Sequence, residues 1–202
     1  MEIFSTLLQI DKDELVADKI LDVCKKILSE TPLDDRYKFG KTTFFNLELI
    51  EKYKEEFNPL YNFIFKNAFE YCSKLEMKNI SNIKINAIWI SEMYKYGSHK
   101  IHSHNNYSEL SGNFYVDVKP NSADIVFNRH EFMSDPLTDY EYENYTKYNS
   151  NEWKIPAEKG KILIWKSDIP HSVDLNMSDS RIAISFNLGI EKKWKLMKHH
   201  TL

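Results

Sequence analysis

The hydrophobic period of this chain changes near Ser81, and this change constrains the fold more than any other feature. Before it, apolar residues recur every three or four positions, as in amphipathic helices. After it, apolar and polar residues alternate, as in half-buried strands. Because the two periods occupy separate parts of the chain, the sequence predicts an α+β fold: an antiparallel β-core, as a jelly roll or barrel, backed by N-terminal helices.

The first predicted helix begins after Asp11, which is interpreted as its N-cap with Glu14 in capping-box position, and it ends before Pro32. A polar, tyrosine-rich segment at 129–154 is interpreted as either a lid or substrate-reading loop or a solvated insertion. The expected strands are 1–10, 84–94, 111–118, 123–128, 161–166, 171–175 and 181–188, and the expected helices are about 12–29, 46–54 and 60–76.

Composition excludes several classes of function. The 202 residues carry a net charge of −3, without the basic balance typical of nucleic-acid-binding domains. No apolar run reaches the ~20 residues that span a bilayer, and the first residues lack the features of a secretory signal. Cys24 and Cys72 are interpreted as buried free thiols in a reducing cytoplasm, with a bridge between them left open. The sequence therefore predicts a cytoplasmic protein with no membrane partner.

A metal site is indicated by His102 and His104. In an extended segment, side chains at positions i and i+2 point the same way, so both imidazoles can reach one ion. His171, after a later strand, is the candidate third ligand, although alone it also fits a buried core histidine. Imidazole suits iron, zinc, copper and nickel, and three protein ligands leave coordination positions open. The other histidines considered are interpreted as surface residues: His99, His130, His199 and His200.

The last predicted strand has one apolar and one polar face. The apolar face carries Ile182, Ile184, Phe186 and Leu188, and the other carries Arg181, Ala183, Ser185 and Asn187. Two readings stay open: the polar face lies in water, or it lines an internal cavity. In the second reading, the Arg181 guanidinium is a candidate anchor for a ligand carboxylate, which it matches with two parallel hydrogen bonds.

Taken in order, these motifs resemble the 2-oxoglutarate/Fe(II)-dependent oxygenases, and more closely a small putative oxygenase subfamily found in bacteria and large bacterial viruses. The resemblance covers about residues 84–190 and is carried by His102-x-His104, Ser111-Gly112-x-x-Tyr115, Gly160-Lys-Ile-Leu-Ile-Trp, His171 and Arg181-x-x-x-Ser-Phe-Asn. It implies a double-stranded β-helix (jelly roll) with the N-terminal helices packed on one sheet. The expected single domain is 1–202, with 1–80 as mainly helical support and 84–190 as the β-core.

The resemblance also implies the cofactors Fe(II) and 2-oxoglutarate. His102, His104 and His171 would be the metal ligands, although His104 falls where the wider superfamily usually has Asp or Glu. Arg181 and Tyr115 match positions that hold the distal carboxylate of 2-oxoglutarate. Many relatives have Ser two residues after the arginine, where this chain has Ala183, so the cofactor-binding candidates on the same face are Ser185 and Asn187.

The implied reaction is hydroxylation of a C–H bond, with dioxygen as cosubstrate and with release of succinate and CO2. The primary substrate stays open, nucleic acid is not indicated, and a homodimer is left open. Two alternatives remain: a jelly-roll metal enzyme that needs no 2-oxoglutarate, such as a three-His dioxygenase or isomerase, and a non-catalytic binding module of the same fold.

Overall fold

The structure is a computed structural model that describes residues 5–78, 80–104, 108–129 and 141–192. Its elements, in chain order, are β1 (Gln9–Lys12), α1 (Glu14–Glu30), the 3-10 turn η1 (Asp35–Tyr37), β2 (Gly40–Thr42), α2 (Glu48–Glu51), α3 (Asn58–Lys74), β3 (Ile80–Tyr94), β4 (His99–His102), β5 (Leu110–Asp117), β6 (Ile125–Asn128), β7 (Glu152–Ile155), β8 (Lys161–Lys166), β9 (His171–Val173) and β10 (Ser180–Lys192).

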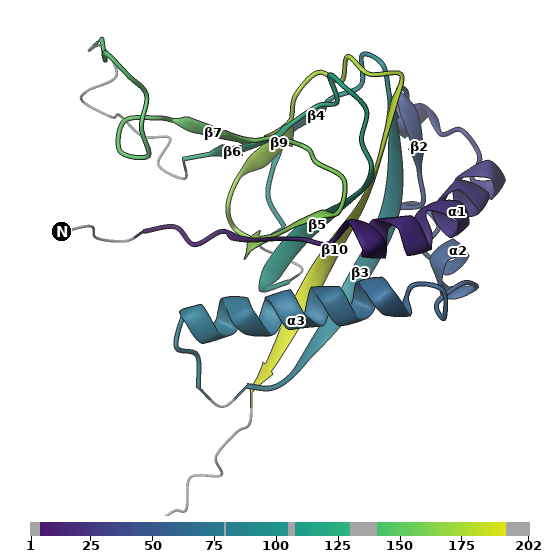
Figure 1. Ribbon diagram of the computed structural model, residues 1–202, viewed down its shortest axis with the longest axis horizontal. Helices are drawn as coiled ribbons and strands as arrows, with labels where there is room; N and C mark the ends of the chain where they lie inside the picture. The colour runs from purple at the N-terminus through teal and green to yellow at the C-terminus, as the bar shows by residue number, and fades with distance from the viewer. Residues whose placement is uncertain (1–4, 79, 105–107, 130–140, 193–202) are drawn as a thin grey trace, which may run out of the picture.

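The strands form two sheets, which confirms the predicted jelly roll. The larger sheet has the order β1-β8-β5-β10-β3-β2, and the smaller has the order β4-β9-β6-β7. Every neighbouring pair for which the register is known is antiparallel. In Figure 1, α3 crosses β3 and β10 of the larger sheet, and the strands of the smaller sheet, β4, β9, β6 and β7, lie above it. Strands distant in sequence, such as β4 and β9, therefore become neighbours.

Strand β10 is the centre of the larger sheet. It pairs with β3 along its whole length and with β5 from Ile182 to Leu188. Its side chains alternate between two environments, since successive residues of a strand point to opposite faces. The apolar set that begins at Ile182 lies in the helix-backed core, and the polar set that begins at Arg181 faces the smaller sheet. The cavity reading of this strand is therefore correct.

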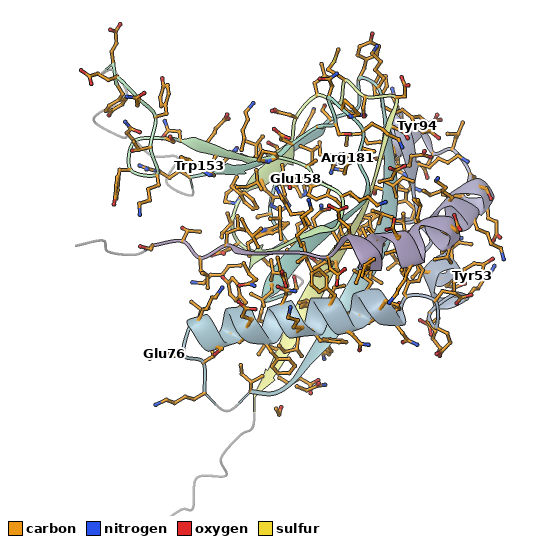
Figure 2. The ribbon with its side chains drawn as sticks, in the orientation of Figure 1. Tyr53, Glu76, Tyr94, Trp153, Glu158 and Arg181 are labelled. Atoms are coloured by element: carbon orange, nitrogen blue, oxygen red, sulfur yellow. The ribbon has the colours of Figure 1, made fainter. Side chains whose placement is uncertain are left out.

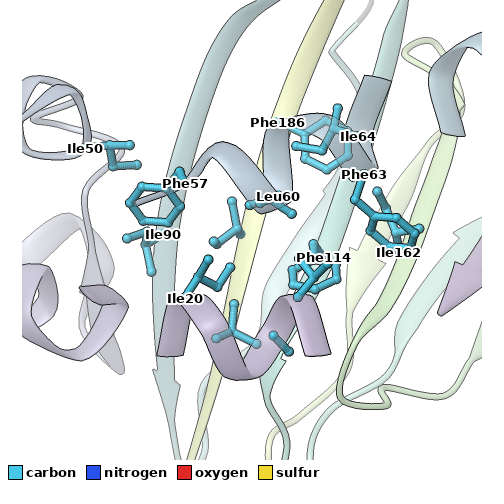
Figure 3. Packing of buried hydrophobic residues seen from close by; sticks show 14 of the residues in the cluster. Ile20, Ile50, Phe57, Leu60, Phe63, Ile64, Ile90, Phe114, Ile162 and Phe186 are labelled. Atoms are coloured by element: carbon cyan, nitrogen blue, oxygen red, sulfur yellow. The ribbon is translucent and has the colours of Figure 1, made fainter. Parts of the chain in front are cut away.

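Helices α1 and α3 cover one face of the larger sheet, as expected, and Figure 3 shows their apolar side chains meeting those of the strands. Both helices carry an apolar stripe at the 3.6-residue period, and burying it is the main source of helix stability in a folded protein. The fully buried side chains at this interface include Ile20, Ile64, Ile90, Phe114, Ile162 and Phe186.

The start of α1 differs from the expectation. Asp13, not Asp11, is the N-cap, because its side chain accepts hydrogen bonds from the backbone N–H groups of Leu15 and Val16 at 3.0 and 3.2 Å. Asp11 instead belongs to β1 and pairs with Lys66 at 3.0 Å. The capping-box interpretation was therefore wrong: the third residue after Asp13 is Val16, so no Glu or Gln side chain stands at the N3 position of α1.

Other boundaries also needed correction. The opening strand covers only Gln9–Lys12 among the described residues, and α2 is limited to Glu48–Glu51. Two short strands, β2 and β7, lie in segments expected to be irregular, because each has few apolar residues. β2 is held by pairing with the longer strand β3, and β7 is held by pairing with the more apolar strand β6. The interpretations of His130, His199 and His200 fall outside the described residues, as does the 130–140 part of the tyrosine-rich segment.

Cys24 and Cys72 are buried free cysteines, as predicted, and burial raises the pKa of both thiols. Across the described residues, none of the helices is both long and apolar enough to cross a membrane.

We predict that Gly112→Ala destabilises the protein by about 1–3 kcal/mol, because this is the usual cost of overpacking a filled core. Gly112 on β5 lies opposite Phe186 on β10, and an added Cβ would overlap the buried Phe186 ring and approach the Leu163 carbonyl oxygen to 2.8 Å. Gly189→Ala on β10 is the control, since its Cβ would meet only side-chain atoms of Asn86 and Lys84. Denaturant unfolding measures both; equal stability of the two variants would contradict the packing account.

Candidate metal centre and its cavity

Three histidines meet at the edge of the smaller sheet. His102 ends β4 and His171 begins β9, and the two residues face each other in the register of that strand pair. His104 follows β4, and its backbone N–H donates to the Ser167 carbonyl at 2.7 Å. Each imidazole offers one nitrogen, and these three nitrogens lie within 4.8 Å of one another. The structure thus brings together the three histidines that the sequence singled out.

The hydrogen bonds of these imidazoles determine which nitrogen each ring offers. The Nδ1 of His102 lies 2.8 Å from the Lys100 carbonyl oxygen, and that of His171 lies 3.0 Å from the Ile169 carbonyl oxygen. A carbonyl oxygen only accepts, so each Nδ1 carries the proton and donates. With its proton on Nδ1, each ring offers Nε2 toward a metal ion, which is the arrangement found around histidines that ligate metals.

His104 is held by a polar network. Its Nδ1 lies 2.8 Å from Asn187 Oδ1, which also accepts a hydrogen bond from Ser111 Oγ at 3.0 Å. The Ser111 hydroxyl in turn lies 2.8 Å from the Ser167 hydroxyl. An amide oxygen cannot donate, so His104 also carries its proton on Nδ1 and offers Nε2. Asn187 therefore already has a hydrogen-bonding role toward His104.

Burial keeps two of the three rings neutral. It lowers the pKa of His171 to about 3, against a smaller opposing effect of the hydrogen bond to Ile169. Burial also lowers the pKa of His104, and the bond to Asn187 again opposes the shift. Trp165 packs edge-on against His171, with ring centroids 4.9 Å apart. Neutral imidazoles keep their lone pairs at neutral pH, as a metal ligand requires.

Arg181 is a buried cation with unpaired donors. Its side chain lies within the body of the molecule (Figure 2), and the residue is only 5% exposed. The Nε and Nη1 groups are buried without a hydrogen-bond partner, and no acidic side chain of the described residues forms an ion pair with Arg181. The guanidinium lies 5.1 Å from the Tyr115 ring centroid, and the buried Tyr115 hydroxyl is also unpartnered. Unpaired buried donors of this kind fit a ligand carboxylate.

The three histidines and Arg181 face one cavity of about 720 Å³, a size typical of small-molecule sites. Arg181, Ser185 and Asn187 line it from β10, together with the three histidines. Ser185 Oγ donates to Asn113 Oδ1 at 3.2 Å across the β5–β10 pair. Tyr115 lies beneath Arg181 in a small buried cluster between the sheets. The cavity therefore contains a candidate metal centre and a candidate carboxylate site.

Sequence reasoning missed two residues beside Arg181. His99 was interpreted as a surface residue, which is wrong: it lines the cavity, and burial lowers its pKa to about 4. Its ring lies 5.3 Å from the ring of Tyr37, whose pKa burial raises to about 12. Tyr37 belongs to the turn η1, far from the β-core in sequence, so no spacing pattern could have indicated it.

Comparisons with known proteins agree with this geometry. The family described as "Putative 2OG-Fe(II) oxygenase", where 2OG is 2-oxoglutarate, matches residues 87–187, which is half of the 202-residue chain. The match begins in β3 and ends in β10, so it includes all three histidines and Arg181. No curated protein matches the chain.

Solved structures share the fold at low sequence identity. HygX from Streptomyces hygroscopicus, with nickel, 2-oxoglutarate and hygromycin B bound, has a TM-score of 0.57 at 9% identity over 94% of this chain and 86% of its own. A prolyl hydroxylase from Trichoplax adhaerens in complex with a peptide fragment gives 0.60 at 13%, over 92% and 83%. The epimerase SnoN, in complex with Fe3+ and α-ketoglutarate, gives 0.61 at 11%, over 98% and 88%. These likenesses show the jelly-roll fold.

We predict that Arg181→Met raises the stability of the ligand-free protein by about 1 kcal/mol or more, because it removes a buried charge whose donors are unpaired. Lys161→Met is the matched control and is expected to lower stability. Lys161 is 8% exposed, but it is paired, donating to the Pro156 carbonyl at 2.8 Å and to Glu158 at 2.6 Å. Denaturant unfolding compares the two; a similar loss in both would mean that the Arg181 charge is already compensated without a ligand.

Proposed function

This chain belongs to the 2OG-Fe(II) oxygenase family, whose cofactors are Fe(II) and 2-oxoglutarate, and on that premise we propose that it hydroxylates a C–H bond of a small molecule in the cavity described above. The observation that carries the proposal is the pairing, in one cavity, of three converging imidazoles with a buried arginine whose donors lack a partner. We also propose that residues 1–202 work as one domain; a cytoplasmic location stays a prediction.

His102, His104 and His171 would hold the metal. Their Nδ1–H groups are anchored to Lys100 O, Asn187 Oδ1 and Ile169 O, so each ring is fixed with Nε2 available. Three neutral ligands leave the full charge of Fe(II) uncompensated, whereas the more usual set of two histidines and one carboxylate removes part of it. We infer that the site favours anionic co-ligands, and the 2-oxoglutarate dianion meets this requirement.

Arg181 would bind the distal carboxylate of 2-oxoglutarate. A guanidinium presents pairs of parallel N–H donors that match a carboxylate, and in either pair one of the buried unpaired nitrogens, Nε or Nη1, would gain a partner beside Nη2. The unpartnered Tyr115 hydroxyl, next to Arg181, is the second candidate donor to this carboxylate. The earlier assignment of Ser185 and Asn187 to cofactor binding stays a prediction, and the bond to His104 gives Asn187 a second proposed role in orienting the metal ligand.

When bound, Fe(II) and 2-oxoglutarate supply the oxidising chemistry, in which one oxygen atom of O2 enters succinate, with loss of CO2, and the other enters the substrate. The residues of this chain bind and orient the reactants. Trp165 and Phe127, with ring centroids 5.0 Å apart, pack around His171 and shield that side of the centre from water. The fold alone does not select hydroxylation, because the SnoN structure described above is that of an epimerase.

We predict that His171→Ala abolishes stoichiometric Fe(II) binding, because two imidazoles remain where three are needed to hold the ion. His99→Gln is the control: it removes an imidazole that lines the same cavity, 6.2 Å from His102 between ring centroids, but lies outside the converging group. Metal content after anaerobic loading and equilibrium dialysis is the readout. One equivalent of iron retained by His171→Ala, or lost by His99→Gln, would show that the ligand set is wrong.

We predict that the protein forms succinate from 2-oxoglutarate when Fe(II), O2 and a small-molecule extract are supplied, and that Arg181→Met slows this by at least about 100-fold. Losing two charge-assisted hydrogen bonds, each of about 1.5–3 kcal/mol, accounts for such a change. Succinate is quantified against a chelator-treated reaction.

Succinate formation, together with the iron content measured by dialysis, separates the alternatives. A jelly-roll metal enzyme that does not use 2-oxoglutarate would bind iron but form no succinate, and its activity would not depend on Arg181. A non-catalytic module would form no succinate with any extract. Succinate formation that is unchanged in Arg181→Met would refute the proposed role of the arginine and leave the oxygenase activity standing.

A further inference from the structure

Three aromatic side chains form one wall of the cavity: Phe44, Phe45 and Trp89, called here the aromatic wall. Phe44 and Phe45 come after β2, separated from it by Thr43, and Trp89 lies on β3, the strand that pairs with both β2 and β10. The register places Trp89 opposite Ser185, on the face of the sheet that also carries Arg181. The wall is therefore part of the same surface that carries the candidate carboxylate site.

The aromatic wall leads directly to the metal centre. The Phe45 and Phe44 ring centroids are 5.4 Å apart, and those of Phe44 and Trp89 are 5.2 Å apart. Trp89 then stacks on His104, with centroids 6.0 Å apart and planes inclined by 20°. A molecule seated against these rings would lie beside one of the three proposed metal ligands.

The outer part of the wall is exposed although it is apolar. Phe44 is 51% exposed and Phe45 is 42% exposed, whereas Trp89 is buried. The Arg36 guanidinium covers the Phe45 ring at 3.6 Å, so the Phe44 ring offers the larger free surface. Exposed apolar rings that border a cavity are typical of ligand-binding surfaces, because a bound ligand removes them from water.

The charged side chains around the cavity, among the described residues, all carry a positive charge. Among the described residues that line it, the charged side chains are Arg36, Lys100 and Arg181, and none is acidic. Arg36 is paired with Asp34 through two hydrogen bonds of 2.8 and 2.6 Å, and Arg181 is assigned to 2-oxoglutarate. A cationic ligand would lose its hydration here without gaining a counter-charge, which is unfavourable.

We propose that the aromatic wall binds the primary substrate, and that this substrate is a small molecule with a flat ring system and no positive charge. The inference rests on the proposed function of the cavity and specifies its substrate class. Flat rings gain offset or edge-to-face contacts with aromatic side chains beyond the area that they bury. The cavity volume, about 720 Å³, accommodates a molecule of this size in addition to 2-oxoglutarate.

The test uses two probes with the same ring and different charge: neutral 2-naphthamide and cationic 2-naphthylmethylammonium. Neither carries a carboxylate, so neither competes for Arg181. Proton NMR titration of the full chain measures their affinities, first without metal and then with Fe(II) and 2-oxoglutarate in the absence of oxygen. We expect the neutral probe to bind at least about tenfold more tightly than the cation, and Phe44→Ala to weaken it by about tenfold.

Phe69→Ala is the matched control, because Phe69 is 49% exposed on α3 and does not line the cavity. It should leave the affinity of the neutral probe unchanged. Equal binding of the two probes would overturn the charge part of the inference. An unchanged affinity in Phe44→Ala, or an equal loss in Phe69→Ala, would overturn the role of the aromatic wall.

The two stages of the titration separate this inference from the proposed function. With Fe(II) bound, the paramagnetic ion should broaden the resonances of the bound neutral probe, since Trp89 of the aromatic wall stacks on the proposed metal ligand His104. Binding of the probe to the metal-free chain, with no effect of added Fe(II), would refute the metal centre and leave the ring-binding surface intact. Failure of the probe to bind a chain that does bind Fe(II) and 2-oxoglutarate would refute only the substrate class.

Discussion

The pairing of β10 between β3 and β5 is the constraint on which the rest of the structure depends. Alternation along this one strand sends Ile184 and Phe186 into the helix-backed core and Arg181 and Asn187 toward the cavity. A slip of one residue would exchange the two faces, burying polar groups in the core and exposing apolar ones to the cavity. Stability and function are therefore fixed by the same register.

The cavity combines three proposed imidazole ligands for a metal ion with the positive charge of Arg181, which has no counter-charge among the described residues that line it. The three imidazoles are fixed through their Nδ1–H groups, and no described acidic residue lines the cavity to offset Arg181 or a bound metal ion. Without ligands such a site is electrostatically unfavourable, because buried charge without a partner costs stability. Family membership names two ligands, Fe(II) and 2-oxoglutarate, of which the second carries the missing negative charge.

The sequence predicted the parts of this account that depend on periodicity. An antiparallel β-core backed by N-terminal helices and the pairing of His102 with His104 follow from alternation and spacing. The family resemblance implied the jelly roll with helices on one sheet and the full set of His102, His104 and His171, and the structure agrees with each. Contacts between distant segments could not be predicted in this way. Phe44 follows a three-residue strand within a polar link, and His99 has no partner at metal spacing in the sequence. Their positions depend on how β2 and β4 pair, which short strands do not encode locally.

The central claim is that one cavity holds Fe(II) through three histidines and 2-oxoglutarate through Arg181. Anaerobic titration of the Fe(II)-loaded protein with 2-oxoglutarate, followed by visible absorption, tests it most directly. The account predicts a weak charge-transfer band that saturates at one equivalent of 2-oxoglutarate per chain, is absent in His171→Ala, and requires a much higher concentration of 2-oxoglutarate in Arg181→Met. Absence of the band in the unmodified protein, with iron bound, would contradict the account.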